Sequence, residues 1–576
     1  MQARLGRGLA AVLALVFAAV AAAEERTLVI FHTNDIHGHI LPSIDFDYPG
    51  EPKPRLGGFA RLSGVVREAR ARAEKAGHGF LLLDAGDIFD GTPEGLETRG
   101  LGIVELMNQV GYDGMAVGNH EFAHGVEAVR ALAQAAKFPW LACNIVLEEG
   151  GVLADFAKPY LVKEAGGLKV AIVGVTTPST PEMNFDENCA GVRFLPYVDR
   201  VARCVEFLRA QVKPDVIVVL SHIGTQADAA LAREVDVPVI VGGHDHVTLE
   251  AGMRRGNSLI CQTGDHLRRV GRIELVYDTV KQAVVRVEAS LINLGGEGPE
   301  PDPAMAAKVE EVRSEAYDEV VGRCDVSCVQ GRDQESRVGN LVTDAMCGQT
   351  GAQVGIMNSG GVRSNLLRGP VTRRDLFEIT PFPDPVRVYT IPGNELLSLL
   401  ESGVPPTGGY KYEVAGLAFT VNLREREGRR VKNVKVGQVT LKEDDSYPVA
   451  ISSFFAQHGA RRAFFAGKPF RESGLTVYDC MVRHFQAVPE VKTRPPGSIG
   501  VSQEKPSEVG AEERIDINRA DALKLTRLPG IGDTLAGRIV KYRTEHGPFR
   551  SADDLLLVKG ISGGVLEKIR DRISVE

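Results

Sequence analysis

The chain has 576 residues, which is too many for a single hydrophobic core and predicts about three to four domains. Apolar residues make up 44% of the chain and charged residues 25%, as in globular proteins, which excludes an intrinsically disordered chain. The formal net charge of -8 argues against a protein that coats nucleic acid with its whole surface, although a local nucleic-acid site remains compatible with it.

Residues 1–23 have the organisation of a cleavable signal peptide. Arg4 and Arg7 supply positive charge, an apolar run covers residues 9–20, and small alanines at 21–23 form a cleavage site. The run is too short to span a bilayer, and no other stretch is long and apolar enough to do so. We therefore expect a periplasmic or secreted protein whose mature chain begins near Glu24.

Short apolar strands alternate with helical stretches between residues 24 and 294. We expect strands at residues 27–31, 80–83, 170–175, 216–220 and 237–241, and helices at 59–75 and 198–211. Such alternation is typical of an α/β sandwich in which ligands bind at the carboxyl ends of strands.

Clusters of polar side chains directly follow the expected strands of this domain. The candidate metal ligands among them are Asp35, His37, Asp87, Asn119, His222, His244 and His246. Carboxylates and imidazoles are common ligands of divalent cations, and a site with two cations needs a bridging carboxylate, for which Asp87 is the natural candidate. Any one cluster alone could be an ordinary turn or a surface histidine. Their coincidence predicts a site for two divalent ions.

The order Asp-x-His, Gly-Asp, Gly-Asn-His-Glu, His and Gly-His-x-His resembles the calcineurin-like metallophosphatases. With the second domain, residues 26–499 resemble their 5′-nucleotidase branch, which includes periplasmic UDP-sugar hydrolases. The resemblance implies a four-layer αββα sandwich and a metal-dependent phosphoric ester hydrolase with two ions such as Zn²⁺ or Mn²⁺. It implies that His120 is the catalytic histidine. One ion would be held by Asp35, His37, Asp87 and His246, and the other by Asp87, Asn119, His222 and His244.

One position next to the catalytic histidine departs from this family. The family often has an aspartate three residues after that histidine, where it orients the imidazole ring, and this chain has Ala123 there. A histidine without its carboxylate is less fixed in tautomer. Whether another acidic residue takes the place of the missing aspartate is left open by the sequence.

A second α/β domain is expected at residues 304–496, after a Gly- and Pro-rich linker. Residues 358–363 read Asn-Ser-Gly-Gly-Val-Arg, in which glycine admits an anion to the backbone N–H groups and arginine can bind phosphate through two hydrogen bonds. Alone, this motif is better explained as a β-turn. Its resemblance to the substrate loop of the family implies that Asn358, Gly360, Gly361 and Arg363 bind substrate, with Arg332 as a further phosphate contact.

The family stacks the nucleobase between two aromatic side chains, which match Phe382 and Phe454 here. Core packing is the commoner role of any isolated phenylalanine. After the second aromatic residue the family usually carries Gly-Gly-Asp-Gly, whereas residues 457–462 of this chain read Gln-His-Gly-Ala-Arg-Arg. The missing aspartate puts an ordinary nucleoside 5′-monophosphate in doubt. The segment suits either a more anionic substrate or a structural loop.

The C-terminal region follows a segment, residues 495–513, that we expect to be a flexible tether. Residues 514–576 form a small all-α unit in which Leu-Pro-Gly-Ile-Gly at 528–532 is nearly repeated as Val-Lys-Gly-Ile-Ser at 558–562. Two helices joined by such a turn are a helix-hairpin-helix, which presents backbone N–H groups to a DNA phosphate. The tail resembles the DNA-binding domain of ComEA-like competence proteins, which implies DNA contacts at Gly530, Ile531, Gly532 and Gly560.

The sequence therefore predicts an exported enzyme that hydrolyses nucleotides and has a tail that tethers it to DNA. Two alternatives remain open. One is a phosphodiesterase that acts on 2′,3′-cyclic nucleotides or on DNA ends. The other is a DNA-binding or uptake accessory with a degenerate phosphatase core. Because basic and acidic residues nearly balance in the tail, a protein-interaction or purely structural module is also compatible with that region.

Overall fold

The computed structural model describes residues 25–46, 48–296, 298–331, 334–405, 409–502 and 514–575. The expected signal peptide and Arg332 lie outside these residues. The chain divides into two compact units, of which the second contains Gly91–Leu96 and everything described from Ser314 onward. The first contains Glu97–Arg313 and everything described before Gly91. No helix in the described part of the chain is long and apolar enough to cross a bilayer.

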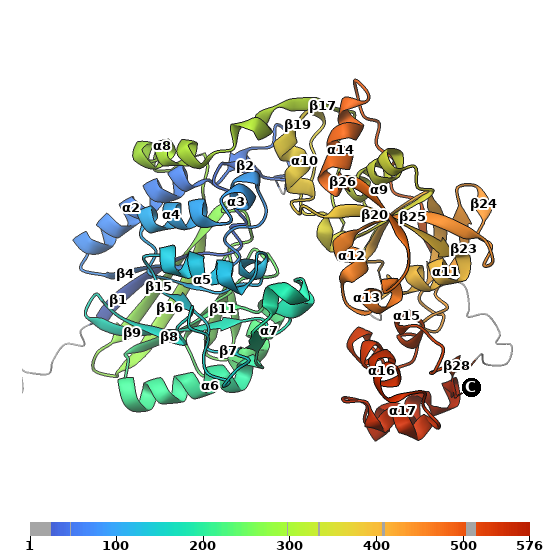
Figure 1. The fold of residues 1–576 in the computed structure, drawn as a ribbon. Helices are drawn as coiled ribbons and strands as arrows, with labels where there is room; N and C mark the ends of the chain where they lie inside the picture. Colours follow the sequence, from blue (N-terminus) through green and yellow to red (C-terminus); the bar gives the residue numbers. More distant parts are fainter. Residues whose placement is uncertain are drawn as a thin grey trace, which may run out of the picture. The chain divides into compact units, whose positions relative to one another are not determined.

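Two six-stranded sheets form the centre of the first unit (Figure 1). The first has the order β16-β15-β1-β4-β5-β6, with β1 Glu25–Thr33, β4 Gly79–Asp84, β5 Gly114–Ala116, β6 Trp140–Leu141, β15 Arg269–Asp278 and β16 Ala283–Asn293. The second has the order β13-β14-β12-β11-β9-β8, with β8 Tyr160–Ala165, β9 Leu168–Thr176, β11 Val216–His222, β12 Val239–Val241, β13 Met253–Arg255 and β14 Ser258–Cys261. The strands expected from the sequence lie in these two sheets.

Apolar side chains of both sheets, such as Ile30 of β1 and Val218 of β11, form one buried cluster between them. Helices cover the two outer faces: α2 Phe59–Lys75, α4 Leu101–Val110 and α5 Val126–Ala135 on the first sheet, and α6 Tyr197–Phe207 and α7 Thr225–Glu234 on the second. Central strands are buried on both faces, which explains their continuous apolar sequences. The predicted αββα sandwich is confirmed.

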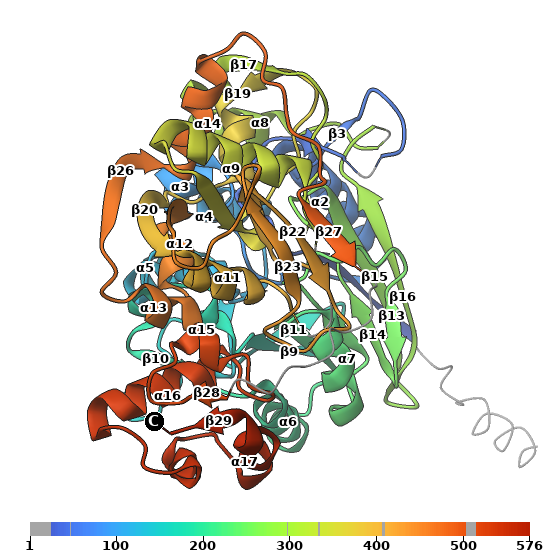
Figure 2. The same ribbon diagram turned by 90° about the vertical axis from the view of Figure 1, so that its right-hand side faces the viewer.

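The second unit contains a five-stranded sheet and a four-stranded sheet (Figure 2). The first has the order β21-β18-β25-β20-β26, with β18 Val354–Asn358, β20 Pro385–Pro392, β21 Tyr412–Ala415, β25 Ser446–Ser452 and β26 Phe470–Thr476. The other has the order β24-β23-β22-β27, with β22 Leu417–Asn422, β23 Val431–Val436, β24 Val439–Thr440 and β27 Ile499–Ser502. Among its helices are α9 Arg337–Thr350, α10 Arg373–Ile379, α11 Gly393–Glu401, α12 Ser453–Gln457, α13 Ala460–Phe465 and α14 Val477–Gln486.

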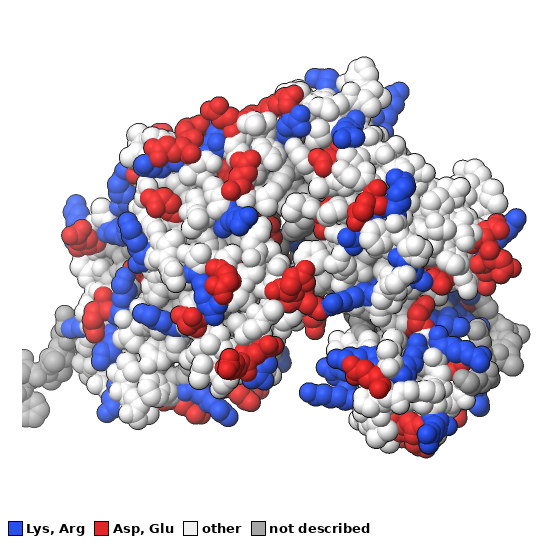
Figure 3. Space-filling model, viewed as in Figure 1, with Lys and Arg blue, Asp and Glu red and all other residues white. Residues whose placement is uncertain are grey.

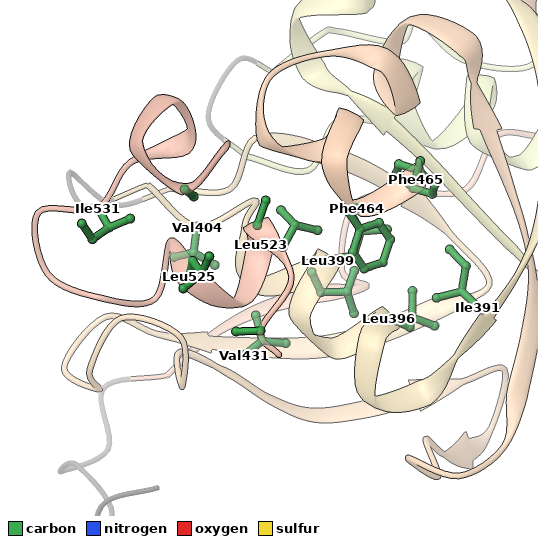
Figure 4. Packing of buried hydrophobic residues seen from close by; sticks show 14 of the residues in the cluster. Ile391, Leu396, Leu399, Val404, Val431, Phe464, Phe465, Leu523, Leu525 and Ile531 are labelled. Carbon is green, nitrogen blue, oxygen red and sulfur yellow. The ribbon is translucent and has the colours of Figure 1, made fainter. Parts of the chain in front are cut away.

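The C-terminal region is helical and packs on this second α/β domain. Its elements are α15 Ala522–Leu525, α16 Asp533–His546, the 3₁₀ helix η7 Ala552–Leu557, α17 Gly563–Ile569 and the short pair β28 Ile515–Asp516 and β29 Ile573–Ser574. Leu523 and Leu525 of α15 belong to the same buried cluster as Leu399 of α11 and Phe464 of α13 (Figure 4). The two parts therefore share one hydrophobic core.

The expectation of a flexible tether at residues 495–513 is wrong for its first half. β27 pairs in parallel with β22, and the carboxylate of Glu335 accepts hydrogen bonds from the N–H groups of Gly497, Ser498 and Ile499 at 2.8, 2.8 and 3.0 Å. These contacts bind the segment to the domain up to Ser502. Residues 503–513 lie outside the described residues.

Acidic and basic side chains are interspersed over each unit on the face shown in Figure 3. Many of them form surface ion pairs, such as Arg130 with Asp155 and Arg387 with Glu472. A mixed surface of this kind agrees with the modest net charge and gives no support to broad, nonspecific coating of nucleic acid.

Candidate metal centre and substrate site

The predicted metal ligands follow strands of the two sheets in the first unit. β1, β4 and β5 run parallel, so that the loops with Asp35, Asp87 and Asn119 leave from the same edge of the first sheet. His222 ends β11, and His244 follows β12, its parallel neighbour in the second sheet. The sandwich brings these loops together, and every one of the seven ligands is buried or half-buried.

The first group of ligands is Asp35, His37 and His246, whose donor atoms all lie within 4.8 Å of one another. The Nε2 atoms of the two histidines are 3.1 Å apart. Asp35 Oδ1 lies 3.5 Å from His246 Nε2 and 4.0 Å from His37 Nε2. Three donors thus converge on one point, as the first predicted metal site requires.

The second group is Asp87, His222 and His244, also with donor atoms within 4.8 Å of one another. Asp87 Oδ2 lies 3.0 Å from His222 Nε2. The amide oxygen of Asn119 lies 3.2 Å from His222 Nε2 and 2.8 Å from His244 Nδ1. Asp87 is also within reach of His37 and so stands between the two groups, where a bridging carboxylate is needed.

Oxygen atoms behind the histidines fix the orientation of three rings. His37 Nδ1 lies 3.1 Å from the carbonyl of Asp90, and His222 Nδ1 lies 2.6 Å from the carbonyl of Ala85. His246 Nδ1 lies 3.1 Å from Asp265 Oδ2. A proton held on Nδ1 in this way leaves the Nε2 lone pair for a metal ion. The donor chemistry of the site therefore fits two divalent cations.

The backbone of the ligand loops also departs from ordinary geometry. Five ligands have positive φ angles: Asp35 (50°), His37 (49°), Asp87 (60°), His244 (92°) and His246 (59°). Residues other than glycine are uncommon in this region, and each costs on the order of 1–3 kcal/mol. This strain turns side chains from separate loops toward one point, and its clustering marks a functional site.

Burial and charge act against each other at these ligands. Burial raises the pKa of Asp35. Burial also opposes ionisation of Asp87, but His222 and His120 beside it hold its pKa well below the usual value. Burial and nearby His222 lower the pKa of His244 to about 4, which keeps its imidazole in the neutral form that binds metal. Cations here would offset the buried negative charge.

His120 lies beside both ligand groups. One of its ring nitrogens is within 4.8 Å of ligand atoms of His37 and Asp87, and its backbone N–H donates to Asp87 Oδ1 at 2.8 Å. Its Nδ1 lies 2.6 Å from Asp90 Oδ2. The predicted catalytic histidine is thus at the edge of the metal site.

Buried Glu121 joins the loops that carry these residues. Its carboxylate accepts hydrogen bonds from the backbone N–H groups of Asp87, Ile88 and Gly118. Sequence reasoning missed Glu121, Asp90 and Asp265, because their roles depend on contacts between loops from different strands. The acidic residue within Gly-Asn-His-Glu was the one available signal for Glu121.

The second unit gathers the predicted substrate residues at one edge of its five-stranded sheet. β18 and β25 are parallel, so Asn358, which ends β18, and α12 with Phe454, which follows β25, leave from the same edge. β20 is antiparallel to β25, with Val386 paired to Ser452, which brings Phe382 to this edge before β20 begins. Gly360 and Gly361 lie in the 3₁₀ turn that follows Asn358, and the N–H of Arg363 bonds to the carbonyl of Ile379 at 2.8 Å.

Three family models match consecutive parts of the chain. Calcineurin-like phosphoesterase matches residues 28–248, the 5′-nucleotidase C-terminal domain matches 316–466, and the helix-hairpin-helix motif matches 510–574. The crystal structure of a 5′-nucleotidase precursor from Thermus thermophilus is 30% identical to this chain, with a TM-score of 0.75. The match covers 83% of this chain and 100% of that one.

The chain belongs to the 5′-nucleotidase family.

Two curated relatives of this family come from Bacillus subtilis (strain 168). The trifunctional nucleotide phosphoesterase protein YfkN is 27% identical over 488 residues, which are 75% of this chain and 32% of YfkN. Endonuclease YhcR is 26% identical over 466 residues, which are 75% of this chain and 37% of YhcR. The chain therefore spans about a third of the length of these two relatives.

The segment that follows Phe454 is packed against the domain. The Arg461 guanidinium lies over the ring of Phe455 at 4.5 Å, and its Nε donates to the Phe455 carbonyl at 2.9 Å. The side chain of Arg461 therefore supports the domain. For this residue, a structural role is favoured over binding of a more anionic substrate. His458 stacks on Phe454, with ring centroids 4.3 Å apart.

The two turns of the helix-hairpin-helix region are alike in structure. The N–H of Ile531 bonds to the carbonyl of Leu528 at 3.0 Å, and the N–H of Ile561 bonds to that of Val558 at 3.1 Å. Each turn contains a glycine with positive φ, Gly530 at 86° and Gly560 at 101°. Gly530 and Gly532 are exposed, whereas Ile531 between them is buried, so the two glycines carry the accessible backbone of this turn.

The second turn ends in a serine instead of glycine without loss of the helix start. The side chain of Ser562 caps α17 by accepting the N–H of Val565 at 3.4 Å. Serine is a preferred residue at this position. The serine of the second turn therefore has a local role, and both hairpins are formed.

Proposed function

We propose that this protein is a phosphoesterase that hydrolyses nucleotides with the help of two divalent metal ions. One observation carries the proposal: two groups of ligands meet at Asp87, with His120 beside them. Names of relatives in the 5′-nucleotidase family support nucleotides as the substrate class. Asn358, Gly360, Gly361, Arg363, Phe382 and Phe454 would bind the nucleotide, and Arg332 would add a phosphate contact.

Each group of residues has a separate task in this proposal. When bound, the cations would supply Lewis acidity toward the phosphoryl oxygens. His120 would donate a hydrogen bond to a phosphoryl oxygen or a proton to the leaving group, since it lies beside both ligand groups. Phe382 and Phe454 would hold the base by stacking, worth roughly 1–3 kcal/mol for each ring.

A screen of metals against substrates tests this function. The purified full chain is stripped with a chelator, reloaded with Mn²⁺ or Zn²⁺, and assayed for phosphate release from a panel of nucleotides. We expect activity to return only with metal, and Asp87→Ala to lower it at least about 10³-fold, since a bridging ligand is lost. Asp155→Ala, at an exposed aspartate outside the site, is the control. The proposal would be refuted if the protein released phosphate from none of the nucleotides with any of the ions.

Phosphodiesterase activity on 2′,3′-cyclic nucleotides or DNA ends is the second candidate. The names of YfkN and YhcR, a multifunctional phosphoesterase and an endonuclease, favour it. The same panel separates the two by comparing 5′-monophosphates with 2′,3′-cyclic nucleotides and with end-labelled DNA. Faster turnover of the diesters would replace the first candidate with the second.

We also propose that the helix-hairpin-helix region binds DNA through the backbone of its two turns, at Gly530, Ile531, Gly532 and Gly560. The supporting observation is that both turns are formed with exposed glycines. Fluorescence anisotropy with a DNA duplex should show binding that weakens steeply as salt rises. If DNA binds but no nucleotide is turned over, the accessory role with a degenerate core takes the place of the enzyme.

Export is the remaining part of the proposal, and it rests on the sequence of residues 1–23. Cell fractionation should find the protein in the periplasm or medium, and N-terminal sequencing should place the mature end near Glu24. An unprocessed chain in the cytoplasm would contradict it.

A further inference from the structure

We propose that Asp90 is the residue that positions His120, in place of the aspartate that the family usually carries three residues after the histidine. This inference rests on the proposed function for its catalytic meaning. His120 Nδ1 and Asp90 Oδ2 are 2.6 Å apart, the distance of a strong, charge-assisted hydrogen bond. Both side chains are largely buried, with exposed fractions of 17% and 9%.

The position that usually supplies the carboxylate is otherwise engaged. Ala123 has only a methyl group, its N–H bonds to the carbonyl of His120 at 3.0 Å, and its own carbonyl accepts from Asn188 Nδ2 at 2.7 Å. The backbone at this position therefore closes the short helix of residues 120–122. In this chain the carboxylate that contacts the imidazole therefore comes from the loop after β4 and not from position 123.

The loop with Asp90 is held rigidly beside His120. Glu121 binds the backbone of Asp87 and Ile88 on one loop and of Gly118 on the other. Asp90 itself has a φ of 37°, an uncommon conformation that the surrounding contacts must maintain. The contacts between the two loops therefore hold Asp90 next to His120.

Asp90 holds a second ring as well. Its carbonyl oxygen lies 3.1 Å from Nδ1 of the metal ligand His37, while its carboxylate holds His120. One residue therefore sets the relative position of a metal ligand and the catalytic histidine. A carboxylate on Nδ1 keeps the proton there, presents Nε2 to the substrate and stabilises the positively charged ring when it forms.

The test exchanges the carboxylate between its two possible positions. Asp90→Asn keeps the backbone carbonyl that faces His37 but removes the charge beside His120. We expect kcat for the nucleotide found in the screen to fall about 10- to 100-fold, with KM changed less than about threefold. The double variant Asp90→Asn with Ala123→Asp should have a kcat at least about tenfold above that of Asp90→Asn alone. Asp155→Asn is the matched control and should behave as the wild-type protein.

Two further measurements separate this role from a structural one. Metal content, measured by elemental analysis, should stay at two ions per chain in Asp90→Asn. The ¹⁵N resonances of His120, assigned by comparison with His120→Gln, should show Nδ1 protonated in the wild-type chain and a change of tautomer or charge state in Asp90→Asn. These resonances can be recorded on the metal-free protein, so the contact is tested even if no substrate is turned over.

Three results would overturn the proposal. One is a kcat of Asp90→Asn within twofold of the wild-type value. Another is loss of metal in parallel with activity, which would show that the Asp90 carboxylate supports the metal centre instead of His120. The third is an unchanged set of His120 resonances in Asp90→Asn. A wild-type chain without phosphatase activity but with the expected resonances would refute only the proposed function.

Discussion

Buried Asp384 links the segments that carry Phe382 and Phe454, the two aromatic residues predicted to stack the nucleobase. It follows Phe382 by two residues in the chain, and it accepts a hydrogen bond from the hydroxyl of Ser453, the neighbour of Phe454, at 3.1 Å. Burial raises the pKa of Asp384 to about 6, against the lowering effects of nearby hydroxyl groups and of Arg387. This carboxyl group couples the two aromatic segments to one another and makes their stability depend on pH.

Asp384→Asn should change how stability depends on pH. Because the pKa of the folded state lies above the unfolded value of 3.8, the stability linked to this group is present below about pH 4 and is lost as pH rises through 6. By pH 8 the free energy of unfolding of the wild-type chain is therefore about 3 kcal/mol lower than at pH 4 because of this group. The variant does not lose this stability. Thermal unfolding at pH 4 and pH 8 should show the variant gaining relative to wild type at the higher pH. Asp444→Asn, at an exposed aspartate, serves as control.

The metal ligands could be predicted from the sequence because each one directly follows a strand that is itself recognisable. Asp35 and His222 needed only the rule that strand ends converge. Asp90 could not be predicted, because its significance lies in a contact with a histidine thirty residues away and in a carbonyl that any residue could supply. Sequence patterns indicate the metal ligands. The residues that orient these ligands can be identified only from the three-dimensional arrangement of the loops.

At the scale of elements, the two helix-hairpin-helix turns pack against the opposite hairpin. A methyl group at Gly530 would come within 3.7 Å of Val565 on α17, and one at Gly560 would come within 2.8 Å of Arg538 and 2.9 Å of Leu535 on α16. The two hairpins therefore support one another reciprocally. The second glycine has far less room than the first.

Gly560→Ala should destabilise the region, since alanine there would adopt a φ of 101° and crowd α16. We expect a loss of about 1–3 kcal/mol and weaker binding of duplex DNA. Gly537→Ala is the matched control, because Gly537 lies within α16 with nothing near its added methyl group. That variant should gain about 0.5–1 kcal/mol. Urea unfolding and anisotropy measure both, and equal effects would contradict the argument.

Elements with a local signal can be predicted from the sequence, and those that depend on distant pairing cannot. The helix expected at 59–75 is α2, because its apolar residues recur at helical spacing. The sequence predicts a tether where β27 lies, because its partner β22 is about eighty residues earlier and the polar segment has no strand pattern of its own. α13 has no clear signal for a similar reason, since its apolar side chains pack on residues that are distant in the chain, among them Tyr389 and those of α15 and α16.

At the scale of the whole molecule, the C-terminal region is part of the core of the second unit. α15 lies beside α13 in Figures 1 and 2, and Phe464 and Leu523 are each only 2% exposed. α13 begins three residues after α12, which carries Phe454. The predicted DNA-binding region and the predicted nucleotide site are therefore built on one packed body.

Leu523→Asp should disturb both parts at once. A buried carboxylate without a partner costs about 3 kcal/mol or more, so calorimetry should show the second unit melting earlier, and hydrogen exchange should speed up in α13 as well as in α15. Leu556→Asp, at a leucine that is 47% exposed in the same region, should change little. Loss of protection confined to residues 514–575 would mean that the shared core is not cooperative.

This shared core also constrains the order in which the protein can fold during synthesis. The cluster runs from Val354 to Ile573, so the second unit cannot complete its interior until residue 573 has left the ribosome. Among the described residues, the buried clusters of the first unit include none beyond Val312, so we expect this unit to form while the rest is still being made. If a ribosome stalls before the tail is finished, Phe464 and Leu399 stay exposed. Chaperones or proteases would then bind an exposed apolar surface on an incompletely folded second unit.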